Sequence, residues 1–220
     1  MSLICLSPQY FVGYNILLEF LFSIITLGVA LFSYKAYKST GLDQIKNFAA
    51  GFFFIFLGYF AQVFTSFLIL LMGHEVVCKR KVLDVLFLNY LGFYSYVLFI
   101  VFGLLILVYM TFKKVKQRVL LLLMLMASVV IFFSSDIFLS FYVLTTITFG
   151  FLSWHFIETY LKNKQTKSFI VSLAFVFLTL ASLLFIVSIN LPVMYVAAKL
   201  LELLGYLFII VNFYLILKKR

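Results

Sequence analysis

The chain has 220 residues, of which 66% are hydrophobic and 11% are charged, and its formal net charge is +10 at pH 7. Soluble domains have about 45–50% apolar residues, so this composition excludes a water-soluble globular protein. We expect an all-α polytopic membrane protein, with residues 1–220 forming a single transmembrane domain, and we attribute the positive charge to membrane topology rather than to nucleic-acid binding.

Apolar runs recur along the chain, each close to the roughly 20 residues that a helix needs to cross about 30 Å of hydrocarbon. They predict a seven-helix transmembrane bundle. The expected spans are 10–34, 48–72, 83–112, 119–134, 137–161, 168–190 and 193–217. The fourth span is short and is separated from the fifth only by Ser134, Ser135 and Asp136, so a six-helix or re-entrant arrangement stays open. Because Ser and Asp are good N-caps, we expect the fifth helix to begin after Ser135 or Asp136.

The positions of the lysines and arginines predict the orientation, because basic loops resist translocation across the membrane. With the N-terminus outside and the C-terminus inside, 13 of the 17 lie in inner loops or in the inner tail. The exceptions are Lys79, Arg80 and Lys81 in an outer loop and Lys199 within the seventh span. No basic residue precedes Lys35, so the start lacks the charged region of a cleavable signal peptide. We expect an integral protein of the plasma membrane.

The first span carries small and polar side chains at steps of three and four residues, which places them on one face of a helix. They are Asn15, Glu19, Ser23, Thr26, Ala30 and Ser33. The second and third spans carry Gln62 and Asn89 on comparable faces. Since polar side chains in a membrane turn towards protein or water, these faces are expected to point into the bundle.

Cys5 and Cys78 are both expected on the outer side, where disulfides persist. A bridge between the N-terminal tail and the first outer loop and a pair of free thiols are both compatible with the sequence. A metal site that combines these cysteines with His74 and Glu75 is geometrically conceivable, but short loops collect such residues by chance.

The fifth span ends with His155 and Glu158, three residues apart. Glu158 is expected to extend to the membrane surface, and a proton relay is the functional alternative. The chain has no HExxH, no GxSxG and no phosphate-binding glycine loop. We therefore expect neither enzymatic activity nor a cofactor.

The seventh span contains Lys199 and Glu202 within an apolar run. Glu19, Gln62 and Glu202 each lie roughly nine or ten residues from the outer end of their span, which is about 14 Å deep. This common depth predicts a polar chamber in the outer half of the bundle. The expected ligand-binding residues are Asn15, Glu19, Gln62, Asn89, Lys199, Glu202 and Tyr206.

Two interpretations of this chamber stay open, and they are compatible with each other. In the structural one, Lys199 pairs with Glu202 or with Glu19 and holds the seventh helix against the first. In the functional one, the chamber binds a small polar or amphipathic ligand or a cation, with Tyr14, Tyr59 and Tyr206 as its walls. A retinal Schiff base on Lys199 is disfavoured, because position 195 is a tyrosine and not an acid.

Three stretches carry a resemblance to known proteins: SYKAYKSTGLDQIKNF, ETYLKNKQTKSF and LLELLGYLFIIVNF. With them the chain resembles uncharacterised prokaryotic, chiefly archaeal, seven-helix membrane proteins, and more loosely the seven-helix sensor modules of bacterial signalling proteins. The resemblance implies a receptor-like or sensory role. Since no soluble output domain is present, we expect a separate membrane or cytoplasmic signalling partner.

The first and fifth spans also end in similar polar segments, SYKAYKST and ETYLKNKQTKS, each followed by a Phe-rich span. Three helices, a weaker fourth and three more would fit the parallel repeats of small sugar transporters. A small-solute transporter is therefore one alternative to the receptor, and a structural subunit of a larger membrane complex is another.

Overall fold

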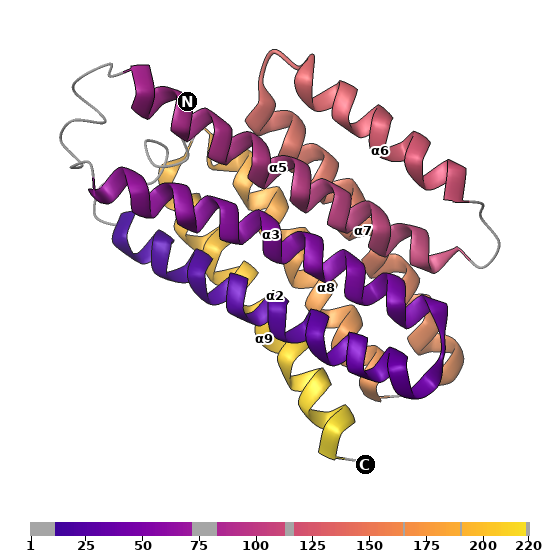
Figure 1. The fold of residues 1–220 in the computed structure, drawn as a ribbon. Coiled ribbons are helices and arrows are strands. Elements are labelled where there is room, and N and C mark those ends of the chain that lie inside the picture. The colour runs from indigo at the N-terminus through magenta and orange to yellow at the C-terminus, as the bar shows by residue number, and fades with distance from the viewer. Residues whose placement is uncertain (1–11, 72–82, 113–116, 165, 190, 219–220) are drawn as a thin grey trace.

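The computed structural model describes residues 12–71, 83–112, 117–164, 166–189 and 191–218, and this part of the chain is all-helical (Figure 1). The described helices are α2 (Val12–Thr40), α3 (Asp43–Leu71), α5 (Leu83–Thr111), α6 (Gln117–Phe132), α7 (Ile137–Asn163), α8 (Thr166–Val187) and α9 (Pro192–Lys218). Six of them are long and apolar enough to cross a membrane, while α6, with 16 residues, is shorter. The protein is thus a helical membrane protein. The predictions about Cys5, Cys78 and His74 lie outside the described residues.

The first two helices extend beyond the apolar spans that the sequence predicted. Helix α2 continues through the polar segment to Thr40, and α3 already begins at Asp43. Gly41 has a φ of +68° and its N–H donates to the carbonyl of Tyr37 at 2.8 Å. A residue in this left-handed conformation ends a helix, and glycine adopts it without strain. Hydropathy predicts only the part of a helix that lies in the membrane. The end of α2 itself is indicated by Gly41.

Helix α7 begins where its capping residue predicted. Asp136 has extended backbone angles, and its side chain accepts a hydrogen bond from the backbone N–H of Leu139 at 3.3 Å. The prediction of a capped start at Ser135 or Asp136 is confirmed at Asp136. At the other end, Lys164 adopts a φ of 49° and its N–H donates to the carbonyl of Tyr160 at 2.7 Å.

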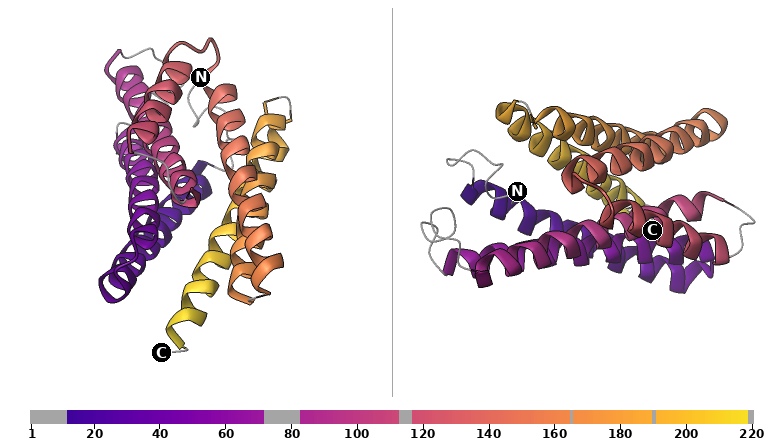
Figure 2. Two further views of the ribbon diagram at one scale, coloured as in Figure 1. Left: turned by 90° about the vertical axis from the view of Figure 1, so that its right-hand side faces the viewer. Right: turned by 90° about the horizontal axis from the view of Figure 1, so that it is seen from above.

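Apart from α6, the described helices form two three-helix units. In the first unit α3 packs between α2 and α5, and in the second unit α8 packs between α7 and α9. Figure 2 shows the two units as two layers, indigo to magenta and orange to yellow. Helix α6 lies along the edge formed by α5 and α7 (Figure 1).

The two units meet along two seams, α2 against α9 and α5 against α7. The helices of each seam run in the same direction (Figure 1). Exchanging α2 with α7, α3 with α8 and α5 with α9 preserves all of these neighbour relations. This equivalence is the arrangement that two parallel repeats produce.

Glycines allow the helices of each unit to approach closely. A Cβ added to Gly103 of α5 would lie 2.7 Å from the carbonyl oxygen of Gly51 of α3, and one added to Gly205 of α9 would lie 2.8 Å from the side chain of Leu178 of α8. Small residues at such contacts stabilise membrane helix pairs because they let backbones pack together.

The outside of the bundle is apolar and part of its interior is polar. Large apolar side chains such as Phe64, Leu121 and Trp154 are exposed, while Asn15, Glu19, Gln62, Lys199 and Glu202 are buried. Such a distribution suits a hydrocarbon solvent, in which polar groups must find partners inside the protein.

Candidate functional site

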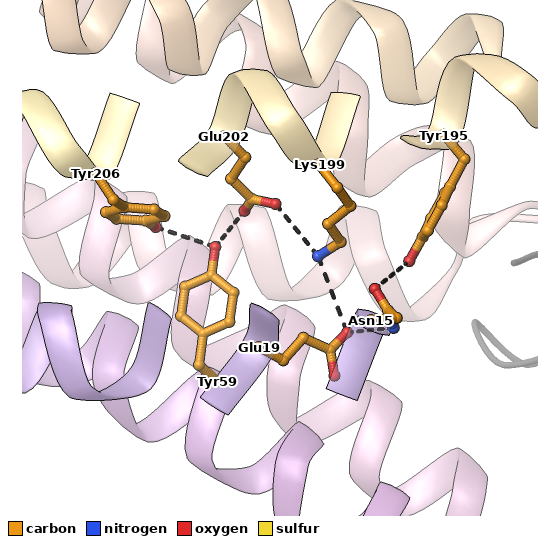
Figure 3. Close-up of polar contacts among 7 residues, drawn as sticks. All are labelled: Asn15, Glu19, Tyr59, Tyr195, Lys199, Glu202 and Tyr206. Atoms are coloured by element: carbon orange, nitrogen blue, oxygen red, sulfur yellow. Dashed lines mark hydrogen bonds and ion pairs between the residues drawn. The ribbon is translucent and has the colours of Figure 1, made fainter. Parts of the chain in front are cut away.

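The polar side chains of α9 project from one side of the helix towards the first unit. Tyr195, Lys199, Glu202 and Tyr206 follow each other at steps of four, three and four residues, so they share one face. All four are buried. They meet residues from α2 and α3, and we call the resulting group the polar cluster. Its members are Asn15, Glu19, Tyr59, Tyr195, Lys199, Glu202 and Tyr206 (Figure 3).

Lys199 lies between two carboxyl groups from different units. Its Nζ atom is 3.2 Å from Oε2 of Glu202 and 3.9 Å from Oε1 of Glu19. The ammonium also lies 5.4 Å from the ring centre of Phe22 and 5.5 Å from that of Phe185. Aromatic faces attract cations, so both rings stabilise the charged form of this buried side chain.

Asn15 links Glu19 to the start of α9. Its Nδ2 group donates to Oε1 of Glu19 at 2.9 Å, and its Oδ1 atom accepts from the hydroxyl of Tyr195 at 3.0 Å. Because Asn15 and Glu19 are one turn apart on α2, the same helix face presents both groups to α9. The α2–α9 seam is therefore joined by a hydrogen bond as well as by an ion pair.

Tyr59 connects α3 to the other end of the cluster. Its hydroxyl donates to Oε1 of Glu202, and it also lies 3.0 Å from the hydroxyl of Tyr206. The rings of Tyr59 and Tyr206 meet edge to face with their centres 5.9 Å apart. Oε1 of Glu202 thus has a hydrogen bond from Tyr59, and Oε2 has an ion-pair contact with Lys199.

Five buried side-chain atoms lack a hydrogen-bond partner among the described residues: Oγ of Ser33, Oδ1 of Asn212, Oε1 of Gln62, Oε2 of Glu202 and Oε2 of Glu19. Oε2 of Glu202 instead has an ion-pair contact with the ammonium of Lys199 at 3.2 Å. All five side chains are buried. An unpartnered polar atom in such a place is costly, and a native structure that retains one is often a site where a proton, a water molecule or a ligand binds. Oε2 of Glu19 lies on the side of the carboxyl group that faces away from Lys199 and has no hydrogen bond from any described residue (Figure 3).

A cavity of about 30 Å³ lies between the two units and reaches the polar cluster at Tyr59, Glu202 and Tyr206. Most of its lining is apolar, with a few hydroxyl groups among the lining residues of α5, α7 and α8. These hydroxyl-bearing residues are Tyr96, Tyr142, Thr145 and Ser182. A cavity of this size holds about two water molecules. It is far smaller than the roughly 300 Å³ at which pockets for organic ligands begin.

The structure brings most of the predicted site residues together. Asn15, Glu19, Lys199, Glu202 and Tyr206 belong to the polar cluster, and the expected pairing of Lys199 with Glu202 and Glu19 is confirmed.

Three other residues predicted for the chamber, Gln62, Asn89 and Tyr14, are not members of the polar cluster. Gln62 is buried one turn beyond Tyr59, and Asn89 is half-buried; neither shares a hydrogen bond with the polar cluster in the described structure. Tyr14 was expected to form a wall of the chamber, and this prediction is wrong, because its side chain is 67% exposed. It projects from a neighbouring position on α2, about 100° around the helix from Asn15.

Tyr195 was not predicted as a site residue, although its position one turn before Lys199 was a usable signal. The cavity-lining residues Tyr142 and Thr145 of α7 were also missed. They are three residues apart and share a helix face, but nothing in the sequence distinguishes that face from a packing surface.

Glu158 lies outside the polar cluster and pairs with Lys162 one turn later, where both side chains are largely exposed. This geometry agrees with the expected position at a membrane surface. Among the described residues, no group of three His, Cys, Asp or Glu side chains is close enough to hold a metal ion.

Comparisons with models of protein families, with curated proteins and with solved structures gave no match.

Proposed function

We propose that this chain is a receptor-like, sensory membrane protein in which the polar cluster is the switch. The observation that carries the proposal is the position of Lys199, between Glu19 of one three-helix unit and Glu202 of the other. A charged group shared across a seam has two alternative arrangements that differ little in packing. A ligand that favours one arrangement shifts the equilibrium between them.

Helix α9 provides the route by which such a shift reaches a partner. The polar cluster occupies its first half, and its C-terminal end projects from the bundle (Figures 1 and 2). A change at Lys199 or Glu202 alters how α9 contacts α2 and α3. A rigid helix transmits that change to its C-terminal end, where a separate signalling protein would bind.

The same proposal includes the topology. Seven crossings, with the N-terminus outside and the C-terminus inside the plasma membrane, place most lysines and arginines on the inner side. This topology counts α6 as a crossing and puts the C-terminal end of α9 on the side of a cytoplasmic partner.

A small-solute transporter is the second candidate, and the equivalence of the two units favours it. Carriers built from parallel repeats bind their substrate between the repeats, where the cavity lies here. The cavity volume of about 30 Å³ favours the receptor, because a transporter must enclose its solute and needs a larger cavity to do so.

Movement of α9 tests the receptor directly. Spin labels are attached through cysteines at exposed Leu161 of α7 and Val211 of α9, in a background without Cys5 and Cys78, and the label distance is measured in nanodiscs. Lys199→Met should change the distance distribution, because it removes the charge that both units share. Lys38→Met, the same change at an exposed site of α2, should leave it unchanged. Identical distributions in all three proteins would contradict the proposal.

Accessibility of the cavity separates the two candidates without knowledge of a substrate. In the same background without Cys5 and Cys78, Ala181→Cys, at a cavity-lining position, is treated with a membrane-impermeant maleimide in right-side-out and in inside-out vesicles. A receptor should be labelled from one side at most. A carrier exposes the site alternately and should be labelled from both sides.

A further inference from the structure

The polar cluster contains more acidic than basic groups. Among the described residues, the carboxyl groups of Glu19 and Glu202 both form an ion pair with the same ammonium group, that of Lys199. If all three were ionised, one uncompensated negative charge would be buried within the bundle. An unpaired buried charge costs several kcal/mol or more, and such groups are usually neutralised by a proton or by a bound cation.

The oxygen atoms of the two carboxyl groups differ in their surroundings. Oε1 of Glu202 accepts a hydrogen bond from the hydroxyl of Tyr59, and Oε2, although it accepts no hydrogen bond among the described residues, has the ammonium of Lys199 at 3.2 Å as its ion-pair partner. Glu19 has both of its partners, Asn15 and Lys199, on Oε1, while its buried Oε2 has neither a hydrogen bond nor an ion pair among the described residues. The first pattern suits an ionised carboxylate. The second suits a neutral carboxylic acid whose carbonyl oxygen is Oε1 and whose hydroxyl oxygen is Oε2.

From this difference we infer that the ligand of the polar cluster is a proton, which Glu19 holds on Oε2 in the conformation described. This inference rests on the proposed function, since it names the ligand of the same switch. It assigns the ionised state to Lys199 and Glu202, which compensate each other at 3.2 Å, and it leaves the cluster without net charge.

The titratable groups near Glu19 among the described residues come from four helices. On α9 they are Lys199, Glu202, Tyr195 and Tyr206, and on α3 it is Tyr59 (Figure 3). On α5 and α7 they are Tyr96 and Tyr142, which interact with Glu19 electrostatically. The tyrosines stay neutral as hydroxyl donors. The charge balance therefore depends on Glu19, Glu202 and Lys199 alone.

Loss of the proton would rearrange the seam. The acid Glu19 becomes a carboxylate, the proton passes to water, and the ammonium of Lys199 then faces two carboxylates instead of one. It is drawn from its 3.9 Å position towards Oε1 of Glu19, which weakens its 3.2 Å contact with Glu202. Glu202 keeps its hydrogen bond from Tyr59, so the change falls on the contact between α2 and α9.

A metal cation fits the site less well than a proton. Alkali and alkaline-earth cations need several oxygen ligands, whereas Oε2 of Glu19 has no hydrogen-bond partner among the described residues and the nearby cavity is lined mainly by apolar side chains. A proton needs only the one unused oxygen that Glu19 offers.

Infrared difference spectroscopy of the full chain in nanodiscs tests the assignment, with buffer protons as the probe. A protonated carboxylic acid has a carbonyl stretching band that an ionised carboxylate lacks. The wild-type protein should show such a band near neutral pH and lose it as the pH rises. Glu19→Gln should lack the band, Glu19→Asp should retain it at a shifted frequency, and Glu158→Gln, which changes an exposed acid, should leave it unchanged.

Glu202→Gln adds a sharper expectation. With Glu202 neutral, Lys199 has only Glu19 as a counterion, so the Glu19 band should disappear at a lower pH than in the wild type. A band that persists in Glu19→Gln, or the lack of any such band in the wild type, would overturn the inference. The same spectra are recorded in sodium and in choline chloride; a band whose pH dependence follows sodium would assign the site to a metal cation.

Stability provides a second readout that does not depend on every variant folding well. Glutamine has the shape of a neutral glutamic acid, so Glu19→Gln should unfold near the wild-type temperature at neutral pH. Strong destabilisation, or failure to fold, would show that Glu19 is ionised and would overturn the inference. The label distances of wild type and Lys199→Met are independent of these results, so the receptor proposal and the proton assignment can fail separately.

Discussion

A lysine buried inside a membrane protein is retained only where its charge is compensated. Lys199 meets this condition through Glu202 and Glu19, together with the rings of Phe22 and Phe185. These groups come from α8 and α9 of one unit and from α2 of the other, so the charge of Lys199 is compensated by both helical units.

Removal of the ammonium should therefore be more damaging than removal of the ion pair. Lys199→Met leaves Glu202 without its counterion, and we expect it to lower the free energy of unfolding by about 3–5 kcal/mol. The double variant Lys199→Met/Glu202→Gln should lose less than the single one, since it strands no charge at position 202. Unfolding in one detergent, followed by circular dichroism, measures both. Equal stability of the wild-type, single and double variants would show that Lys199 and Glu202 do not compensate each other's charge.

Sequence reasoning predicted the charged members of the polar cluster and missed part of its hydrogen-bonded frame. Lys199, Glu19 and Glu202 were predictable because an intramembrane charge needs a partner, whatever the fold. Tyr195 was not identified as a partner of Asn15, because a tyrosine in an apolar helix serves equally well in packing or at the membrane surface. Asn89 was expected in the chamber from its helix face, but periodicity does not give the rotation of a helix relative to the bundle.

At the scale of the helices, the α3–α5 contact depends on glycines that face backbone atoms. Gly51 and Gly103 lie against each other, and either one would place an added Cβ within 3.0 Å of the other's carbonyl oxygen. The backbone cannot give way as a flexible side chain can. This contact holds α3 in place, and with it the hydroxyl of Tyr59 at Glu202.

Gly103→Ala should consequently destabilise the protein by about 1–3 kcal/mol, the usual cost of overpacking. Gly28→Ala in α2 is the matched control, because an added Cβ there meets nothing within 4 Å. In a helix this change should be neutral or stabilising by up to about 1 kcal/mol. Thermal unfolding in the same detergent compares the two, and an equal loss in both variants would show that the close α3–α5 contact is not the cause.

The helix positions were predictable from apolar length to within a few residues, except at the junction of α2 and α3. There the polar segment before Gly41 continues the helix, and hydropathy alone does not detect this. The glycine itself is the better signal, since it is the residue that ends helices in a left-handed conformation.

At the scale of the whole molecule, the two similar polar segments lie at the C-terminal ends of α2 and α7, which are equivalent places in the two units. The sequence suggested the repeat from these segments, but the neighbours of each helix could not be derived from it. Which helix occupies the middle of a unit depends on side-chain packing between segments, and apolar surfaces in lipid are too similar to specify it from periodicity alone.

The proposed topology makes α6 a crossing helix, which labelling can check. In the cysteine-free background, single cysteines replace Ser39, Ser135 or Lys164, all of which are exposed. If α6 crosses the membrane, an impermeant maleimide should label positions 39 and 164 from the inside and position 135 from the outside. Labelling of position 135 from the same side as position 39 would show that α6 does not cross.

Helix α9 and the first unit meet in one buried polar cluster, and a double-mutant cycle between Tyr59 and Glu202 tests this contact most directly. These residues lie 143 positions apart in the sequence and belong to different units. The free energies of unfolding of Tyr59→Phe, Glu202→Gln and the double variant should reveal a coupling of about 0.5–3 kcal/mol. Additive effects, within about 0.5 kcal/mol, would mean that the two side chains do not interact and would contradict the account.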